Sequence, residues 1–493
     1  SYCGWQGGDL MKLSQLFENA PDMEIEGLCL DSRLAKENDM YFCMEGIVHD
    51  GHDFIDDVLD KGVKCIVHSK ELSNMRKGVA YIKVENVNRT LNSVASRFYG
   101  NPSKKMKVFG VTGTNGKSSV TNIIQDVYSH FHPCGYIGTI SIRYGNVTLP
   151  PNLTTPDPII LHHAMHDMVE NGMEAVALEV SSHGLELGRV QSVDFDIAIF
   201  TNLTYDHLDF HGTFENYFEA KKKLFTNLKP EGIAVLNADD EYFDRLKDAT
   251  KAKVVTYGIQ NDADYHADNI RMGTDGSSFV LRCKEGTFEV TTNLVALYNI
   301  YNLLAAVAAM CESGIKVEDM LPYLETLKQI EGRLERIDEG QPFNVFVDFA
   351  HTPDGMEKVF EYAKGITPDN CSIIAVFGSA GKRDTKKRKV FGEIADRYCD
   401  SIILTEDDPR DESAKDIANE IRSGIKNTNS IFIEDRYAAI RQAIESANVN
   451  DTVLILGKGD EVFMYREFGR EEWMGDHNVA RHCIRKYTLG IEE

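Results

Sequence analysis

Short apolar runs alternate with stretches of helical periodicity through the middle of the chain. The apolar runs predict strands, and the amphipathic stretches between them predict helices. The expected strands are 108–111, 175–179, 197–201 and 233–236, and the expected helices include 158–171 and 214–226. This alternation is typical of a mostly parallel sheet with helices on both faces. The sequence therefore predicts a central α/β domain.

A second alternation of the same kind fills the C-terminal third. The expected strands are 344–348, 372–377, 401–404, 430–433 and 452–456, and the expected helices are 354–364, 387–397, 414–425 and 436–447. This pattern predicts a complete doubly wound, Rossmann-like domain. Toward the N-terminus, strand-like runs flank one helix-like run and predict a small α/β module. Its expected strands are 40–44, 65–68 and 80–84, and its expected helix is 54–61.

We therefore expect an α/β protein of three domains. The N-terminal module spans 11–103 and ends at the turn-forming residues Asn101-Pro102-Ser103. A central domain with a phosphate-binding loop spans 104–332, and the C-terminal domain spans 333–493. Residues 1–10 are glycine-rich and lack the charged-then-apolar pattern of a secretion signal. We expect them to be a remnant of cloning outside the fold.

Composition limits the classes of function. The longest apolar runs are too short to cross a bilayer, so no membrane insertion is expected. The ten cysteines form no C-x-x-C pair, which argues against a zinc site, and scattered thiols suggest the reducing cytoplasm. The formal net charge of −24 argues against a nucleic-acid partner. The basic run 382–389 is either a solvated loop or a local cluster of cations that binds an anionic ligand.

The run Gly110-Val-Thr-Gly-Thr-Asn-Gly-Lys-Ser-Ser119 joins an expected strand to an expected helix. Gly113 and Gly116 allow backbone N–H groups to close around oxyanions, and the helix N-terminus adds partial positive charge. Lys117 can reach the outer phosphates, and the Ser118 hydroxyl can hold Mg²⁺. The alternative is a glycine-rich surface turn. The strand-to-helix context favours a nucleoside triphosphate site.

Polar groups follow two further expected strands. Glu179 ends one strand and is either a magnesium ligand or an acid that caps the next helix. The stretch from Asn202 to His211 follows another strand, and its imidazoles, including His207, either serve a site or are satisfied within a turn. Taken alone, Lys221 belongs to three consecutive lysines that suggest a solvated face.

In order, these segments resemble the Mur ligase family from Met11 to about residue 488. The matching stretches are Asp31-Ser-Arg33, Gly113-Thr-Asn-Gly-Lys-Ser118, Thr154-Thr-Pro156, Leu178-Glu-Val-Ser-Ser-His-Gly184, Asp206-His-Leu-Asp-Phe-His-Gly212, Glu331-Gly-Arg-Leu-Glu335, Asp348-Phe-Ala-His351 and Gly457-Lys-Gly-Asp-Glu461. The resemblance implies a uridine-nucleotide module, a central ATPase domain and a C-terminal domain that brings the amino acid. It implies a cytoplasmic ligase, expected to be a monomer. That ligase adds a diamino acid to UDP-N-acetylmuramoyl-L-alanyl-D-glutamate through an acyl phosphate, in peptidoglycan synthesis.

The resemblance also implies roles for individual residues. The catalytic set is Lys117, Glu179, His207 and Lys221, with Lys221 carried as a carbamate. Mg²⁺ is expected at Ser118, Glu179, His207 and carbamylated Lys221. ATP is expected at Gly113, Thr114, Asn115, Gly116, Lys117, Ser118, Ser119, Asn299, Asn302, Arg333 and Asp348. The uridine-linked substrate is expected at Ser32, Thr154, Thr155, Ser182 and Arg189, and the diamino acid at Arg383, Asp407, Asp408, Arg410, Gly457 and Glu461.

The loop Asp407-Asp408-Pro409-Arg410 leaves the added amino acid open. Family members that add diaminopimelate usually have Asn at the second position, and lysine-adding members often lack the Arg. Arg410 favours the second carboxylate of meso-diaminopimelate, whereas Asp408 repels it. Asp408 and Glu461 favour the ammonium of L-lysine. Both substrates therefore remain open, and ornithine is a further possibility.

Two rival interpretations remain. One is another amide ligase of the same superfamily, of the folylpolyglutamate or cyanophycin type, against which Asp31-Ser32-Arg33 argues. The other is an inactive nucleotide-binding homologue, against which the retained Lys117, Glu179 and His207 argue. The sequence also departs from the family pattern at Ala296, where a glycine is usual.

Overall fold

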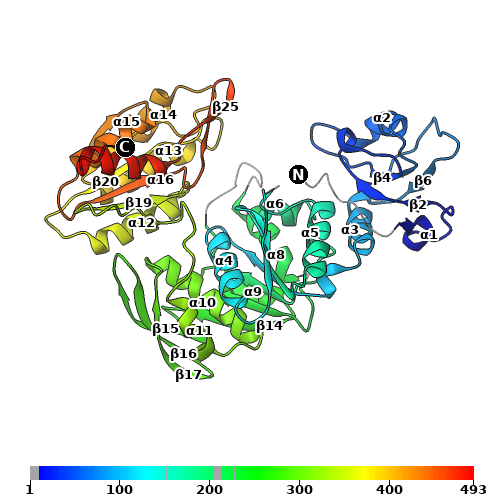
Figure 1. Cartoon of the computed structure of the whole chain (residues 1–493), viewed down its shortest axis with the longest axis horizontal. Helices are drawn as coiled ribbons and strands as arrows, with labels where there is room; N and C mark the ends of the chain where they lie inside the picture. Colours follow the sequence, from blue (N-terminus) through cyan, green and yellow to red (C-terminus); the bar gives the residue numbers. More distant parts are fainter. Residues whose placement is uncertain (1–9, 152, 205–212, 227, 493) are drawn as a thin grey trace.

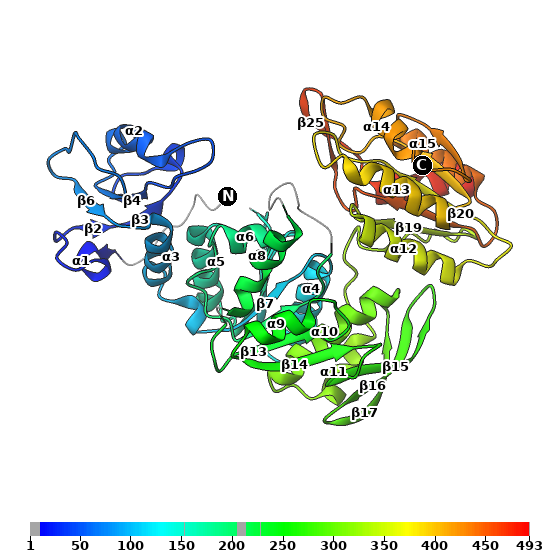
Figure 2. The same cartoon turned by 180° about the vertical axis from the view of Figure 1, so that it is seen from behind.

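The computed structural model describes the whole chain except residues 1–9, 152, 205–212, 227 and 493. It consists of three α/β domains, as the sequence predicts. The N-terminal and C-terminal domains lie on opposite sides of the central one, which both views show (Figures 1 and 2). Among the described residues, none of the helices has the length and apolarity to span a bilayer.

The N-terminal domain is built on a small parallel sheet of order β3-β4-β5-β6. Its middle strand pair is fully buried, which fits a sheet covered on both faces. The elements are β1 (Met11–Lys12), α1 (Leu13–Leu16), β2 (Glu24–Ile25), β3 (Gly27–Cys29), η1 (Ser32–Leu34), β4 (Asp39–Phe42), η2 (Gly51–Phe54), α2 (Ile55–Asp60), β5 (Cys65–His68), β6 (Ala80–Lys83) and α3 (Val87–Phe98). A 3₁₀ turn, η3 (Pro102–Lys104), leads into the central domain.

The central domain holds one large sheet of order β10-β9-β8-β11-β7-β12-β13-β14-β15-β16-β17 in the described chain. Strands from β8 to β15 run parallel, and β9, β10, β16 and β17 are antiparallel at the two edges. The mostly parallel sheet is thus confirmed, while the antiparallel edges were not predicted. The strands are β7 (Lys107–Thr112), β8 (Cys134–Ile137), β9 (Ile142–Tyr144), β10 (Val147–Leu149), β11 (Ala175–Glu179), β12 (Ile197–Phe200), β13 (Ile233–Asn237), β14 (Lys253–Gly258), β15 (Tyr265–Met272), β16 (Ser277–Cys283) and β17 (Gly286–Thr292).

Helices cover both faces of this sheet, and each face has its own apolar core. The helices are α4 (Lys117–Tyr128), α5 (Pro158–Glu170), α6 (Ser182–Glu186), α8 (Phe214–Thr226), α9 (Phe243–Ala249), α10 (Leu297–Glu312) and α11 (Val317–Leu324). Helix α10 is buried along most of its length and packs on α4, the helix that follows the glycine-rich loop. The loop is therefore held between a rigid strand and a buried helix pair.

The C-terminal domain has a sheet of order β18-β19-β23-β20-β21-β22. All its neighbouring strands are parallel except β18, which joins antiparallel at one edge. The doubly wound prediction is confirmed for the parallel strands but omitted the edge strand β18. The elements are β18 (Glu335–Arg336), β19 (Asn344–Asp348), α12 (Pro353–Ile366), β20 (Ile373–Phe377), α13 (Lys386–Tyr398), β21 (Ser401–Leu404), α14 (Ala414–Arg422), β22 (Asn429–Phe432), α15 (Arg436–Ser446), β23 (Thr452–Leu456), β24 (Phe463–Arg466), β25 (Gly469–Glu472), α16 (Asp476–Cys483) and η4 (Ile484–Thr488).

Helices α3 and α5 pack together where the N-terminal and central domains meet. Tyr99 stacks on His163 with a ring separation of 4.9 Å, and its carbonyl lies 3.0 Å from His166 Nδ1. The neighbouring His162 is fully buried, and neither of its ring nitrogens has a hydrogen-bond partner among the described residues. Burial lowers the pKa of His162 to about 4, because the charged imidazole would lose its hydration.

We expect His162 to make the protein acid-sensitive. Its pKa is lower in the folded state than the usual histidine pKa of 6.5, so the unfolded state binds more protons between those values. The free energy of unfolding should therefore fall as pH drops from about 6.5 toward 4, by roughly 3 kcal/mol in all. Between pH 7 and pH 5, His162→Leu should lose less of its free energy of unfolding than the parent does, as measured by urea unfolding at the two pH values. The exposed His49→Gln is the control, and equal losses in parent and His162→Leu would contradict the expectation.

Candidate active site

The glycine-rich loop between β7 and α4 has a backbone that requires glycine at two positions. Gly113 has φ of 149° and Gly116 has φ of 94°. A Cβ at Gly113 would lie 1.8 Å from Thr201 Oγ1, and one at Gly116 would lie 2.4 Å from Asn302 Oδ1. The close approach of these two side chains leaves no space for a larger residue. The loop thus has the strand-to-helix geometry that the sequence predicts for phosphate binding.

Asn202, just beyond β12, holds this loop in place. Its Oδ1 accepts from the Asn115 backbone N–H at 3.0 Å, and its Nδ2 donates to the Asn115 carbonyl at 3.0 Å. Its own carbonyl accepts from the Thr114 N–H at 2.9 Å. The Lys117 amine donates to the carbonyls of Gly113 at 2.8 Å and Thr114 at 3.2 Å. Lys117 therefore folds back over the loop in this state.

Glu179 lies at the carboxyl end of β11 and is fully buried. Its carboxylate accepts from Ser118 Oγ at 2.8 Å, from the Thr139 backbone N–H at 2.9 Å, and from the Tyr136 hydroxyl. Two of the four predicted magnesium ligands, Ser118 and Glu179, are thus brought together. A Cβ at Gly138 would lie 1.9 Å from Glu179 Oε2, so a glycine is needed beside the carboxylate. Hydroxyl and carboxylate oxygens are the donors that Mg²⁺ prefers, and this pair fits the ion.

Tyr136 and Thr139 are the partners of Glu179 that sequence reasoning missed. Tyr136 lies in the apolar strand β8, and burial raises its pKa well above the usual value, so it remains a hydroxyl donor. The Arg143 guanidinium lies 4.3 Å from the centre of the Tyr136 ring. Nothing in the local sequence distinguishes Tyr136 from a core tyrosine. Only the parallel pairing of β8 with β11 brings it to Glu179.

Lys221 approaches the loop from α8. Its side chain is 1% exposed, and its amine donates to the Gly113 carbonyl at 2.7 Å. The amine also lies 4.9 Å from the ring centre of Tyr217, whose hydroxyl contacts Thr114 Oγ1 at 2.9 Å. The interpretation of Lys221 as a solvated lysine is therefore wrong. The other predicted catalytic residue, His207, lies outside the described residues.

A cavity of about 970 Å³ opens beside the loop and is lined by the central and C-terminal domains. Its walls include most of the predicted nucleotide site. The predicted residues that line it are Thr114, Asn115, Gly116, Lys117, Ser118, Ser119, Thr154, Glu179, Arg189, Asn299, Asn302, Arg333 and Asp348. Its size is within the range of small-ligand pockets, so a nucleotide can be accommodated.

The far wall of this cavity comes from the junction with the C-terminal domain. Arg333 lies 4.7 Å above the Phe349 ring, and buried Asp348 accepts from the backbone N–H groups of Leu334 at 2.7 Å and Ala350 at 2.8 Å. Burial raises the pKa of Asp348. On α10, Asn302 Nδ2 donates to Asn299 Oδ1 at 3.2 Å. Ala296 before α10 has φ of 76°, the left-handed region that favours glycine.

The residues predicted to bind the uridine-linked substrate are only partly brought together. Thr155 donates to the Glu179 carbonyl at 2.9 Å, and the Arg189 guanidinium donates to the Thr155 carbonyl at 3.2 Å. Ser182 is buried, and its hydroxyl has no partner within the described chain. Ser32 lies in η1 of the N-terminal domain and does not line the cavity.

The C-terminal domain contains a separate charged cluster from two loops. Buried Lys458 donates to Asp408 Oδ1 at 2.8 Å and to Glu461 Oε2 at 2.7 Å. Asp408 Oδ1 also accepts from the Tyr465 backbone N–H at 2.9 Å. The Arg410 guanidinium donates to the Gly381 carbonyl at 2.9 Å. Lys458 thus pairs with both acids and offsets part of their charge, and its role was not predicted, although it lies within the quoted Gly457–Glu461 motif.

The other predicted amino-acid residues lie around this cluster. Gly457 has φ of 113°, and a Cβ there would meet Asp407 Oδ2 at 2.4 Å. Burial raises the pKa of Asp407. Arg383 is exposed near the start of α13. None of these described residues lines the nucleotide cavity, so this structure holds the two predicted sites apart.

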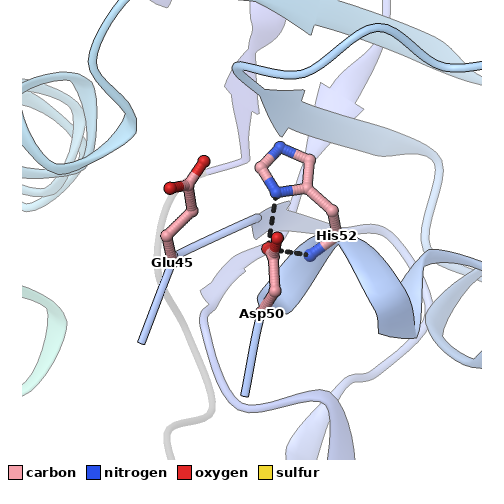
Figure 3. A group of neighbouring side chains, drawn as sticks. All are labelled: Glu45, Asp50 and His52. Carbon is pink, nitrogen blue, oxygen red and sulfur yellow. Dashed lines mark hydrogen bonds and ion pairs between the residues drawn. The ribbon is translucent and has the colours of Figure 1, made fainter. Parts of the chain in front are cut away.

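A third acidic cluster lies in the N-terminal domain (Figure 3). Glu45, Asp50 and His52 offer ligand atoms within 4.8 Å of one another. However, the Lys70 amine pairs with Asp50, and His52 Nδ1 lies 2.7 Å from the same carboxylate. His52 Nε2 accepts from the Ser69 backbone N–H at 3.1 Å. Because the Lys70 amine already pairs with both acids and both imidazole nitrogens are engaged, we assign no metal site here.

A phosphate-binding loop at the carboxyl end of a parallel sheet, beside a buried carboxylate, is typical of enzymes that bind a nucleoside triphosphate with Mg²⁺. The comparisons with known proteins agree with this class and give the family. The family models describe the Mur ligase family, catalytic domain at 24–99, the Mur ligase middle domain at 111–310, and the Mur ligase, glutamate ligase domain at 332–459. The chain belongs to the Mur ligase family.

Individual relatives match over almost the whole chain. A UDP-N-acetylmuramoyl-L-alanyl-D-glutamate--2,6-diaminopimelate ligase from Geobacillus kaustophilus is 39% identical, over 97% of this chain and 100% of its own. A ligase of the same name from Fusobacterium nucleatum is 39% identical, over 94% of each chain. A solved structure of a ligase with this name has a TM-score of 0.71 at 30% identity, covering 96% of this chain and 99% of its own. The MurF ligase of Thermotoga maritima in complex with ADP shares the fold, with a TM-score of 0.66 at 20% identity, covering 94% of this chain and 98% of its own.

Proposed function

We propose that this ligase adds meso-diaminopimelate to UDP-N-acetylmuramoyl-L-alanyl-D-glutamate, using ATP, in peptidoglycan synthesis. The observation that carries the choice of amino acid is the ion pair between Lys458 and Asp408. The sequence left Asp408 as a group that repels the second carboxylate of diaminopimelate. The buried Lys458 ammonium pairs with Asp408 and so weakens its repulsion of that carboxylate, while Arg410 attracts it. The names of the relatives support the same substrate.

The residues around the loop account for the first half-reaction. Phosphoryl transfer depends mainly on alignment and on neutralising phosphate charge. We propose that the Lys117 amine moves from the loop carbonyls to the outer phosphates, and that the loop N–H groups hold the remaining oxygens. Mg²⁺ bound at Ser118 and Glu179 would neutralise further phosphate charge. Tyr136 and Thr139 fix the Glu179 carboxylate by donating to it.

Two further groups complete the proposed metal site. His207 is proposed as a ligand from the family resemblance. Lys221 is proposed to react with carbon dioxide to form a carbamate, which would turn its cation into an anion beside the loop. The position of its amine supports this step, because the amine is buried and lies 2.7 Å from the Gly113 carbonyl, so a carbamate formed there would lie beside the loop.

The C-terminal cluster accounts for the second half-reaction. We propose that Arg383 binds the α-carboxylate of the incoming amino acid, Arg410 its distal carboxylate and Glu461 its distal ammonium. The amine then attacks the activated carbonyl of the substrate's D-glutamyl end. Because the described cluster does not line the nucleotide cavity, the C-terminal domain must close on the central one before this step. The N-terminal domain with Ser32 is proposed to hold the uridine end.

The test of this proposal is phosphate release from ATP with the muramoyl-dipeptide nucleotide, comparing meso-diaminopimelate with L-lysine. We expect turnover with diaminopimelate only. Arg410→Ala should lower kcat/KM for diaminopimelate roughly a hundredfold, because a carboxylate would be left unpaired. Asp408→Asn should change it only a few-fold. Arg397→Ala, on the exposed side of α13, is the control. Turnover with L-lysine but not with meso-diaminopimelate would contradict the proposed substrate. If neither amino acid supports phosphate release, the proposed function is wrong.

We expect Glu461 to add a pH dependence to the use of diaminopimelate. Burial raises the pKa of Glu461 to about 7, although Lys458 opposes this shift. Below that pH the carboxyl is neutral and no longer attracts the distal ammonium. The pH profile of kcat/KM reports the pKa values of the free enzyme. Below pH 7, the parent's kcat/KM should therefore show an additional decrease of about tenfold per pH unit that is absent from Glu461→Gln. Parallel profiles for the parent and Glu461→Gln, with Glu472→Gln as the exposed control, would contradict this expectation.

A further inference from the structure

Arg436, the first residue of α15, is fully buried in the C-terminal domain. Burial of a guanidinium is costly unless every N–H finds an acceptor. Arg436 lies outside the nucleotide cavity, and it belongs to neither of the two loops that form the Lys458 cluster. Its burial therefore calls for a role other than direct contact with a ligand.

The guanidinium of Arg436 joins the starts of the two loops. Its Nη1 donates to the Glu406 carbonyl at 3.0 Å, and its Nη2 donates to the Leu456 carbonyl at 3.0 Å. Glu406 comes directly before Asp407-Asp408, and Leu456 comes directly before Gly457-Lys458. One side chain thus holds both loops at the point where they leave the sheet.

The sheet itself does not hold these loops together. The loops follow β21 and β23, and in the sheet order β20 lies between these two strands. No ladder hydrogen bond therefore joins β21 directly to β23 in the described structure. Arg436 joins the ends of these two strands directly, through the Glu406 and Leu456 carbonyls.

Asp476, the first residue of α16, completes the arrangement. It is fully buried and accepts from Arg436 Nε at 2.8 Å and from Nη2 at 2.8 Å. Trp473 Nε1 donates to the same carboxylate at 3.2 Å, and the Trp473 backbone N–H donates to the Val462 carbonyl at 3.0 Å. This bidentate pair fixes the plane of the guanidinium, so the directions of its two bonds to the loops are fixed as well.

The spacing of the loops determines the Lys458 cluster. The Lys458 amine can reach Asp408 at 2.8 Å only while the two loops keep their present separation, since Glu461, its other partner, lies in the same loop as Lys458. We infer that Arg436 and Asp476 form a positioning pair that sets this separation and so controls the choice of amino acid. This inference rests on the proposed function, because the two loops are the proposed amino-acid site.

Replacing both Arg436 and Asp476 with apolar residues distinguishes a purely structural role of the pair from a positioning role. Exchange of a buried ion pair for apolar residues of similar volume is often neutral for stability or stabilising. Arg436→Met alone should destabilise the protein, because it leaves Asp476 unpaired, and Arg436→Met/Asp476→Leu should recover much of the melting temperature. If the pair served stability alone, the double variant would also recover selectivity. The positioning role predicts that it does not, because both carbonyl contacts are lost.

The readout is the ratio of kcat/KM for meso-diaminopimelate to that for L-lysine, measured by phosphate release. We expect this ratio to fall about tenfold to a hundredfold in the double variant, since displacement of a site by about 1 Å has effects of this size. The KM values for ATP and for the uridine nucleotide should remain unchanged. Arg481→Met is the control, because it lies on α16 but pairs with Glu339. A folded double variant with the parent ratio would overturn the inference.

Amide hydrogen exchange gives a second readout that does not depend on turnover. Amides of 406–411 and 457–462 should exchange faster together in Arg436→Lys, because an ammonium cannot serve both carbonyls and the carboxylate in one plane. Should the double variant not fold, Arg436→Lys with parent selectivity and parent exchange would overturn the inference. If the parent enzyme is inactive with both amino acids, the proposed function is refuted. The hydrogen exchange of the two loops can still be measured in that case, and it tests whether Arg436 holds them together.

Discussion

Lys117→Ala should abolish phosphate release, with kcat at least about a thousandfold below that of the parent. The lysine amine lies against the phosphate-binding backbone, where it donates to the Gly113 and Thr114 carbonyls. Its loss leaves the charge that develops on the transferred phosphoryl group without this partner. The effect should fall mainly on kcat, because the loop N–H groups and the cavity walls still bind the nucleotide. Steady-state phosphate release with all three substrates checks this expectation.

Two controls make the Lys117 result interpretable. Circular dichroism and the melting temperature should match the parent, since Lys117 is only part-buried and its contacts are with loop carbonyls. Lys389→Ala, which removes an exposed lysine on α13, should retain full activity. A Lys117→Ala enzyme with more than about a tenth of parent turnover would refute the assignment of the phosphate loop.

Lys221→Ala should lower turnover by a similar order, about a hundredfold or more, because it removes the proposed carbamate ligand. Small carboxylates such as acetate or formate should restore part of the activity, since they can occupy the space of the carbamate and supply its oxygens. Activity of the parent should also fall when bicarbonate and carbon dioxide are removed from the buffer. Phosphate release with and without added acetate measures the rescue.

Lys222→Ala is the matched control for Lys221. It removes the next lysine of α8, which pairs with Glu219 and is partly exposed. We expect no loss and no response to acetate in this variant. A fully active Lys221→Ala enzyme would reject a catalytic role for this residue. An inactive one that acetate fails to rescue would leave a role for the lysine and reject the carbamate.

Much of the fold could be predicted because the interior strands are short and uniformly apolar. The strand β11 and the helix α8 were predicted to the residue, and their boundaries coincide with changes in periodicity. The strands from β15 to β17 were missed. They have exposed positions along one face and pair only with one another beyond β14, so their pattern is closer to that of a surface segment.

The burial of Lys221 has a signal in the sequence, namely its position on the apolar stripe of α8. The buried residues of α8 include Tyr217, Leu224 and Phe225, and Lys221 falls on the same stripe at helical spacing. Position within the apolar stripe would have separated it from Lys222. In contrast, the charge state around Asp408 depends on Lys458, which is fifty residues away in sequence. No local pattern could have revealed that pair.

The ion pair between Lys458 and Asp408 has a consequence for how such enzymes diverge. Asn and Asp codons differ by a single base, so an exchange at position 408 lies one mutation away. In this protein the buried Lys458 ammonium pairs with the carboxylate that the exchange introduces. We therefore expect this exchange to leave the substrate unchanged, in which case the identity of residue 408 on its own would be a poor marker of which cell-wall peptide an organism makes.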